Sequence, residues 1–397
     1  MDFIKNISIF FMAGLLIFLA MIALIRNEWL INKSLYFGIV VALFASVVIY
    51  VYCFDVRPIA RWDLLQHYRT IDLMKENGWH FVWTKGEYKD RYIISLYFYI
   101  MSFMPDYRLV PVIPLVIEFS IALYLFEKSM KVYEVNDAYP IGDAAFTTLA
   151  WFATFGIKLA VSGVRCVWAV SLCALAIYWE AVRKEHKIAA YSLYVIAYGI
   201  HDFALVLIFI RLLMMIKDKR FLTICVFLGM VCLSGLLPVL YSMMPNPSLR
   251  RIYRYWTNSS ILSFIKGRST SELSVILCMI IVMLYYAYVN YSIRRKLESI
   301  DYGTANCRRN PEDLQIIEFT STLAVVAIAA CYLYVFTERL LYLVAYGFLL
   351  CIPYYRKLKA NNFTVDVLML FIMLWLWFFN DIYPLMVNET GVYFLAR

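Results

Sequence analysis

Three ionisable side chains stand in apolar surroundings, where charge is costly: Arg165, His201 and Asp202. Arg165 follows a small-residue turn at the start of an apolar segment, and the His201-Asp202 step interrupts another such segment. A charged side chain at bilayer depth costs about 2.5–3.5 kcal/mol on insertion scales, so these groups need partners or a water-filled cavity. A guanidinium can hold phosphate oxygens in two parallel hydrogen bonds, and an imidazole can hold or deprotonate a hydroxyl. A snorkelling or salt-bridged arginine and a structural histidine are the alternatives.

The elements that must position these groups are membrane helices. The 397 residues are 63% hydrophobic and 16% charged, and long apolar runs recur, so the sequence predicts an all-α polytopic membrane protein. The apolar runs lie at residues 7–25, 35–53, 109–126, 144–159, 164–181, 221–241, 273–291, 319–336, 340–353 and 365–379. Segments 92–104 and 188–216 are short or interrupted. We therefore expect about 10–13 transmembrane or re-entrant helices, in a single domain covering residues 1–397.

Basic loops predict how the chain is oriented. Lys and Arg are concentrated in the loops at 183–187, 211–220, 292–318 and 356–359, which assigns these loops to the cytoplasmic side. The chain between the first two of these loops must then enter the membrane and return to the same side, with His201 at its tip. Arg165 then lies at the outer end of its helix. Counting membrane crossings from these cytoplasmic loops puts two other loops outside, at about 54–91 and 243–271. Because these two loops are also basic, the inverted topology stays open.

The first external loop predicts an amphipathic helix on the membrane surface that begins at Asp63. Its apolar side chains recur at helical spacing, at Leu64, Leu65, Tyr68, Ile71 and Met74. A carboxylate in this position can act as a base for a hydroxyl group. Asp55 and Asp90 are further external carboxylates beside membrane segments, and helix capping or a salt bridge explains each of the three at least as well.

The second external loop alternates cations and aromatic rings, in the run Arg250, Arg251, Tyr253, Arg254, Tyr255 and Trp256. Guanidinium groups suit a phosphate, and ring faces suit the apolar side of a sugar, so the run predicts a site for a phosphate that carries sugars. Binding to anionic lipid is the alternative. A further candidate is Arg339, which follows Glu338 between two apolar segments; a self-neutralising pair is the alternative there.

Other function classes lose support. The chain has no HExxH, GxSxG, Walker or EF-hand pattern, and its four histidines lack metal-ligand spacing, so we expect neither a metal nor a cofactor. The nine cysteines form no CxxC pair, and all except Cys307 lie in or at the edge of apolar segments, which indicates small core residues. The net charge of +9 lies in loops near lipid head groups, so we expect the lipid bilayer and no nucleic acid as a partner.

In their order along the chain, these residues resemble the EpsG and Wzy-type polysaccharide polymerases of bacterial envelopes. The family has an Asp followed by a Tyr in its first large external loop, which Asp63 and Tyr68 match at a wider spacing. It then has an Arg after a small-residue turn, as at Arg165, where Cys166 stands in place of the usual Gln.

The later part of the chain continues the resemblance. The family's aromatic-His step before a small apolar run corresponds in position to Ile200 and His201, and Asp202 follows the histidine here. An acidic-Arg step before a Tyr is similar to Glu338-Arg339 followed by Tyr342.

The resemblance implies a GT-C-like glycosyltransferase in the bacterial inner (plasma) membrane. Such an enzyme joins undecaprenyl-diphosphate-linked oligosaccharide repeat units on the outer face of the membrane, for O-antigen of lipopolysaccharide, capsule or exopolysaccharide biosynthesis. The lipid diphosphate is then the leaving group, and the acceptor sugar hydroxyl needs a base. The residues that would bind the diphosphate are Arg165, Arg254 and Arg339, together with Arg250 and Arg251. The catalytic candidates are His201, which would hold or deprotonate the acceptor, and Asp63 as the alternative base; the sugar contacts would be Tyr68, Tyr253, Tyr255, Trp256 and Tyr342.

Two other functions use similar chemistry. A flippase or exporter of lipid-linked sugars also needs cations and aromatic rings, but favours repeated halves, which this sequence does not show. A GT-C ligase or single-sugar transferase differs only in its acceptor. A chain-length regulator is a further partner that the sequence leaves open.

Overall fold

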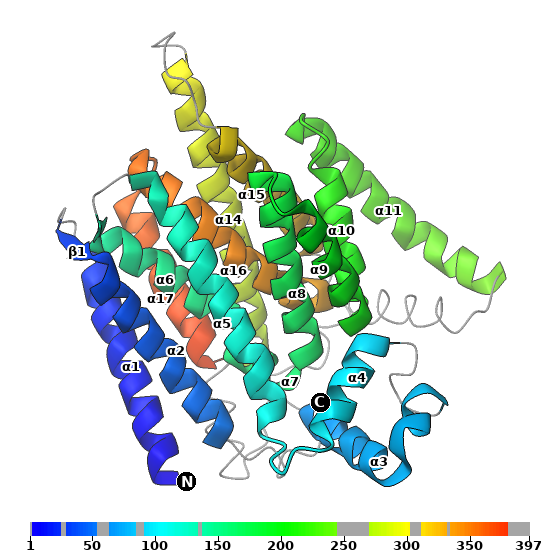
Figure 1. Cartoon of the computed structure of the whole chain (residues 1–397). Helices are drawn as coiled ribbons and strands as arrows, with labels where there is room; N and C mark the ends of the chain where they lie inside the picture. The colour runs from blue at the N-terminus through cyan, green and yellow to red at the C-terminus, as the bar shows by residue number, and fades with distance from the viewer. Residues whose placement is uncertain are drawn as a thin grey trace.

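The computed structural model of the chain describes residues 2–24, 29–53, 63–84, 91–133, 137–243, 270–301, 311–331 and 334–379. The helices pack into a bundle, with the N-terminal helix at one edge (Figure 1). In chain order the elements are α1 (Asp2–Leu24), β1 (Leu30–Asn32), α2 (Lys33–Cys53), α3 (Asp63–Thr84), α4 (Tyr92–Met101), α5 (Leu109–Met130), η1 (Lys131–Tyr133), β2 (Ala138–Pro140), α6 (Ile141–Phe155), α7 (Ile157–Ser162), α8 (Val164–Ile177), η2 (Tyr178–Arg183), α9 (Lys187–Ile200), α10 (Phe203–Leu213), α11 (Lys219–Met243), α14 (Thr270–Asp301), α15 (Pro311–Ala330), α16 (Tyr334–Lys357) and α17 (Phe363–Trp377).

Six of the described helices are long and apolar enough to cross a membrane, which confirms a multi-pass membrane protein. An α-helix rises 1.5 Å per residue, so a span of 18 residues or more reaches about 27 Å, close to the thickness of the hydrocarbon core. The six spans are Ile4–Leu24, Lys33–Cys53, Leu109–Tyr133, Val164–Arg183, Leu273–Ser299 and Asp313–Ala330.

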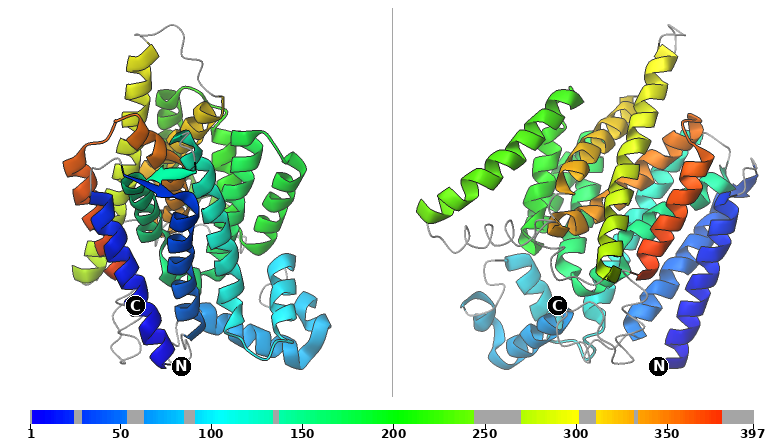
Figure 2. Two further views of the ribbon diagram at one scale, coloured as in Figure 1. Left: turned by 60° about the vertical axis from the view of Figure 1, so that its left-hand side comes forward. Right: turned by 180° about the vertical axis from the view of Figure 1, so that it is seen from behind.

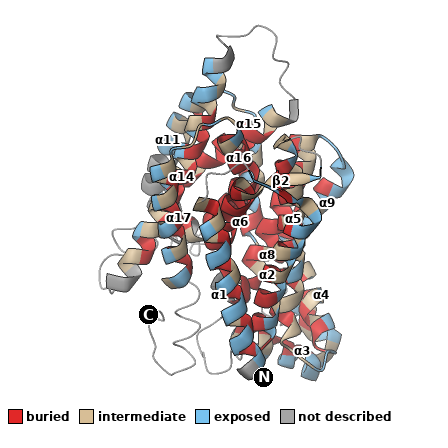
Figure 3. Ribbon diagram, turned by 90° about the vertical axis from the view of Figure 1, so that its left-hand side faces the viewer, coloured by how far each residue is buried: buried red, intermediate tan, exposed pale blue. Residues whose placement is uncertain are grey.

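The centre of the bundle is formed by α6, which packs against α1, α16 and α17. Every side chain of α6 from Ala144 to Phe155 is buried, and its ribbon is red in Figure 3. In contrast, α1 exposes large apolar side chains such as Phe10 and Ile17 on its outer side. Lipid tails are as apolar as leucine, so an apolar outer face is stable only in a bilayer.

The bundle has two distinct ends. α3, α4 and α7 gather at one of them, which we call the α3 end (Figures 1 and 2). The other end carries the turn between η2 and α9 and the C-terminal end of α14. We call it the basic end, because Lys184, Lys187, Arg295 and Lys296 lie there.

A short antiparallel pairing of β1 with β2, in which Ile31 lies opposite Tyr139, was not part of the all-α prediction. The backbone N–H of Ile141 also donates to the carbonyl of Trp29 at 2.8 Å. These bonds join the α1–α2 connection to the start of α6. The departure is local and leaves the helical architecture unchanged.

Two predicted helices are wrong in their extent. The segment 144–159 is not one helix, because α6 ends at Phe155 and α7 begins after Gly156, whose φ is 68°. A positive φ is accessible to glycine because it lacks a Cβ atom. The segment 319–336 is also divided, since α15 ends at Ala330 and α16 begins at Tyr334. Apolar composition continues through both breaks, so hydropathy could not reveal them.

The predicted break at His201 is confirmed. α9 has 14 residues and α10 has 11, and they form two short helices joined at His201 and Asp202. At 1.5 Å per residue they reach only about 21 and 17 Å, less than the hydrocarbon core. The segment 92–104 is likewise the short helix α4.

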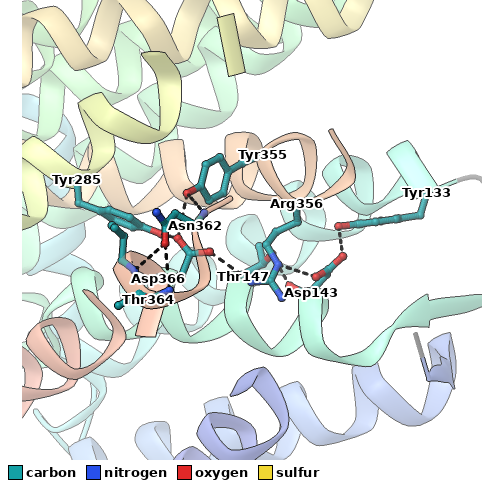
Figure 4. A network of polar contacts seen from close by, with 10 residues as sticks. Tyr133, Asp143, Thr147, Tyr285, Tyr355, Arg356, Asn362, Thr364 and Asp366 are labelled. Atoms are coloured by element: carbon teal, nitrogen blue, oxygen red, sulfur yellow. Dashed lines mark hydrogen bonds and ion pairs between the residues drawn. The ribbon is translucent and has the colours of Figure 1, made fainter. Parts of the chain in front are cut away.

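A polar network joins four helices near the C-terminal end of α16 (Figure 4). The Arg356 Nε donates to Asp143 Oδ1 at 2.7 Å, and its Nη1 lies 3.5 Å from Asp366 Oδ2. The hydroxyls of Tyr285 and Tyr355 donate to Asp366 Oδ1 at 2.9 and 3.0 Å. Buried charges are tolerated when they are paired and hydrogen-bonded. The network therefore holds α6, α14, α16 and α17 together. Arg356, whose charge the sequence analysis used only to orient the chain, thus has a structural role.

Candidate functional site

The candidate site is the cluster around Arg165 and His201, and α3 forms one wall of it. α3 begins at Asp63 as predicted. Its buried stripe includes Leu64, His67, Ile71 and Met74, and α3 packs on α4 and contacts α7. The spacing of three and four residues is that of one helical face, so α3 lies with this face against the bundle.

Tyr68 and Tyr107 connect this wall to the loop before α5. Their ring centroids are 5.8 Å apart, and the Tyr107 hydroxyl donates to Asp72 Oδ1 at 2.8 Å. Tyr68 is half-buried, so the predicted sugar-binding ring lies at the α3 end with part of its surface accessible.

His67 is the residue of this wall that the sequence analysis missed. Its side chain is only 1% exposed, and its ring centroid lies 4.9 Å from that of Phe98 on α4. Burial, and then the charges of Arg165 and His201, hold the pKa of His67 well below its ordinary value. His67 is therefore a neutral imidazole within electrostatic reach of both predicted residues. Its place in the stripe with Leu64 and Ile71 was the signal that could have revealed it.

Two successive helix breaks, at Gly156 and Gly163, position Arg165. α7 is a six-residue helix between Gly156 and Gly163, and the Cys166 backbone N–H donates to the Gly163 carbonyl at 2.8 Å. This turn starts α8 and sets Arg165 at its second position, where its side chain is half-buried. Arg165 lies close enough to His67 and His201 to perturb both electrostatically.

His201 has a defined hydrogen-bonding state. The backbone N–H of Phe203 donates to His201 Nδ1 at 3.0 Å, which caps the start of α10. A neutral ring whose Nδ1 accepts must carry its proton on Nε2. Burial, and then the charges of Arg339, Arg165 and Arg91, lower the pKa of His201 to about 3. The Nε2–H is therefore a hydrogen-bond donor, which favours holding an oxygen over removing a proton.

Arg91 was not a predicted site residue. It precedes α4, its guanidinium lies 4.8 Å from the ring centroid of Tyr198, and it forms an ion pair with Asp202. This pair joins α4 to the tip of the α9–α10 hairpin. It also neutralises Arg91, one of the three cations near the histidine.

Arg339 approaches His201 from α16, where its side chain is half-buried. One turn further on, Tyr342 is only 3% exposed, and its hydroxyl donates to the carbonyl of Gly156 at 3.3 Å. The ring centroid of Tyr342 lies 5.6 Å from that of Phe155. Tyr342 thus anchors α16 at the α6–α7 break and lies in the core, beside the predicted site.

The remaining predicted site residues are one described carboxylate, Asp63, and residues that the structure does not describe. Asp63 is exposed at the first position of α3, and no described contact joins it to His67, His201 or Arg165. The cations and rings of the predicted second external loop lie outside the described residues, as do Asp55 and Asp90; they are Arg250, Arg251, Tyr253, Arg254, Tyr255 and Trp256.

The structure thus brings together two guanidiniums and two neutral imidazoles from four separate segments, at Arg165, Arg339, His67 and His201. Guanidiniums and the N–H groups of neutral imidazoles can both donate hydrogen bonds to phosphate oxygens. Comparison of the chain with protein-family models, curated proteins and solved structures finds no match.

Proposed function

We propose that this chain is a bacterial inner-membrane glycosyltransferase with a GT-C-like fold. It polymerises undecaprenyl-diphosphate-linked oligosaccharide repeat units into O-antigen, capsular polysaccharide or exopolysaccharide on the outer face. The observation that supports this proposal most is the junction of α9 and α10, where His201 Nδ1 accepts from the Phe203 backbone N–H at 3.0 Å and the ring lies within electrostatic reach of Arg165 and Arg339.

The reaction develops negative charge on its leaving group. A hydroxyl of the incoming repeat unit attacks the anomeric carbon of the growing chain, and the bond from that carbon to the diphosphate oxygen breaks. Arg165 and Arg339 stabilise the departing lipid diphosphate. Removing one such preorganised donor typically lowers the rate by about 100-fold to 1000-fold.

His201 acts as a donor in this proposal. Its Nε2–H hydrogen-bonds to an oxygen of the acceptor sugar or of the diphosphate, because Nδ1 is already used by Phe203. The proton of the acceptor hydroxyl then passes to a carboxylate. Asp63 on α3 is the proposed base, and its exposure allows it to meet an acceptor that arrives from outside the bundle.

The test is a reaction of the purified protein in detergent with an undecaprenyl-diphosphate oligosaccharide, with products resolved by length. We expect a ladder that steps by whole repeat units. Detergent removes any membrane to cross, so a transporter gives no product there. A single added unit supports a ligase or single-sugar transferase instead, and either result overturns the proposal.

Matched variants link the ladder to the site. Arg165→Lys keeps the charge and loses the two-pronged geometry of the guanidinium, so we expect it to abolish the ladder. Arg69→Gln removes an exposed cation from α3 and is expected to leave the ladder unchanged.

A further inference from the structure

A cavity of about 300 Å³ lies at the basic end, far along the bundle from the cluster around His201. Its walls come from η2, the start of α9, the end of α10, and α15, which contributes Gln315. A volume of this size is at the lower end of ligand pockets, and it is large enough for a phosphate-bearing head group.

The lining of this cavity carries excess positive charge. Arg211 donates from Nε and Nη2 to the two oxygens of Glu180, at 2.5 and 2.7 Å, so these two charges cancel. Lys184 and Lys187 also line the cavity, and neither has an ion-pair partner among the described residues. Three cations against one carboxylate give this lining a net charge of +2.

The positions of the two lysines are set by the backbone. Lys184 directly follows η2 and lies in the left-handed region at φ 60°, and the Glu185 backbone N–H donates to the Trp179 carbonyl at 2.9 Å. Lys187 is the first residue of α9, whose N-terminal backbone N–H groups favour an anion. The turn therefore holds both lysines at the cavity.

An apolar face leads away from the cavity along α9. Ile188, Tyr191, Val195 and Tyr198 recur at spacings of three and four residues, and their side chains are between 41% and 85% exposed. Tyr191 also lines the cavity, as does Met215, which is 74% exposed. A charged pocket that continues into an exposed apolar helix face matches a molecule with a phosphate at one end and a hydrocarbon chain at the other.

We propose that this cavity binds the phosphate head group of an anionic membrane phospholipid, with an acyl chain along the exposed face of α9. The cavity is lined by both legs of the α9–α10 hairpin, through Lys187 and Arg211. Lipid at this point ties together the base of the hairpin whose tip carries His201. The site is separate from the proposed glycosyltransferase site and does not depend on it.

The test measures binding of short-chain phosphatidylglycerol, of phosphatidylcholine with the same acyl chains, and of inorganic phosphate, to the purified full chain. We expect phosphatidylglycerol to bind most tightly. Each basic residue near an anionic surface contributes about 1 kcal/mol, so the double variant Lys184→Gln/Lys187→Gln is expected to weaken that binding roughly 10-fold to 30-fold. Ile188→Asn is expected to weaken lipid binding and leave phosphate binding unchanged.

The matched control is Arg295→Gln/Lys296→Gln, which removes two exposed cations from the basic end outside the cavity. We expect it to bind phosphatidylglycerol as the unaltered protein does. An equal loss in both double variants overturns the proposal, because general charge attraction then explains the binding. Equal affinity for phosphatidylglycerol and phosphatidylcholine, or for lipid and inorganic phosphate, overturns it as well.

Discussion

The guanidinium of Arg91, at the start of α4, forms an ion pair with the carboxylate of Asp202, the residue that follows His201. The two side chains are 22% and 53% exposed, so the pair is partly screened by solvent. The pair matters for geometry, because it fixes α4 against the hairpin tip that carries the histidine.

Exchanging the charges of this pair tests its positioning role. Arg91→Asp and Asp202→Arg are each expected to reduce polymer formation, and the double exchange is expected to restore part of it. A double-mutant cycle on thermal stability should give a coupling of roughly 0.5–1 kcal/mol, at the lower end for contacting residues. Independent effects, with no recovery in the double variant, would show that the pair does not position the site.

Gly199 permits the close approach of α9 to α4. A Cβ atom at this position would meet Ile93 Cγ1 at 2.6 Å and Cβ at 3.1 Å. Overpacking of this kind costs typically 1–3 kcal/mol. We expect Gly199→Ala to displace α4 and reduce polymer formation, while Gly38→Ala on α2, where the added Cβ meets nothing within 4 Å, is neutral. Equal activity of both variants would contradict this account of the α4–α9 contact.

The two nitrogens of His201 can be tested separately. In His201→Asn the amide oxygen can still accept the Phe203 backbone N–H, so α10 keeps its cap while the Nε2 donor is lost. We expect the Asn variant to unfold at nearly the unaltered temperature but to polymerise about 100-fold to 1000-fold more slowly. His201→Ala loses the cap as well, and should be less stable by about 1 kcal/mol. An Asn variant with full activity would remove the proposed donor role.

The buried histidines predict a pH dependence of stability. Burial lowers the pKa of His67 well below its ordinary value, and the unfolded chain has a histidine pKa of about 6.5. Below that pH the unfolded state binds more protons than the folded state, so folding stability is complete above about pH 6.5 and falls as the pH decreases. His201, whose pKa is lowered to about 3, acts in the same direction.

Thermal unfolding in detergent between pH 8 and pH 5 checks this prediction. The midpoint temperature is expected to fall below about pH 6.5, and His67→Phe should make that fall shallower. His80→Gln removes an exposed histidine from the same helix and should leave the profile unchanged. A profile that is the same in the His67 and His80 variants would contradict the burial argument.

The membrane helices and the break at His201 could be predicted from the sequence, because lipid leaves a long apolar run few alternatives to a helix. His67 was recognisable only by its helical spacing from Leu64 and Ile71 on α3, because the chemistry of a histidine says nothing about its burial. The break at Gly156 accepts a hydrogen bond from Tyr342, a residue distant in sequence, so this contact could not be predicted from local sequence. The Arg91–Asp202 pair joins segments that are distant in sequence, and only the tertiary structure brings them together.

The most direct test of the central claim is the equilibrium binding of undecaprenyl diphosphate to the purified chain. We predict that Arg165→Gln and Arg339→Gln each weaken binding at least about 10-fold, since each removes a charge-assisted contact worth roughly 1.5–3 kcal/mol. The control Arg69→Gln, on the exposed face of α3, should bind as the unaltered protein does. Unchanged affinity in both Arg165→Gln and Arg339→Gln would contradict the assignment of this cluster as the diphosphate site.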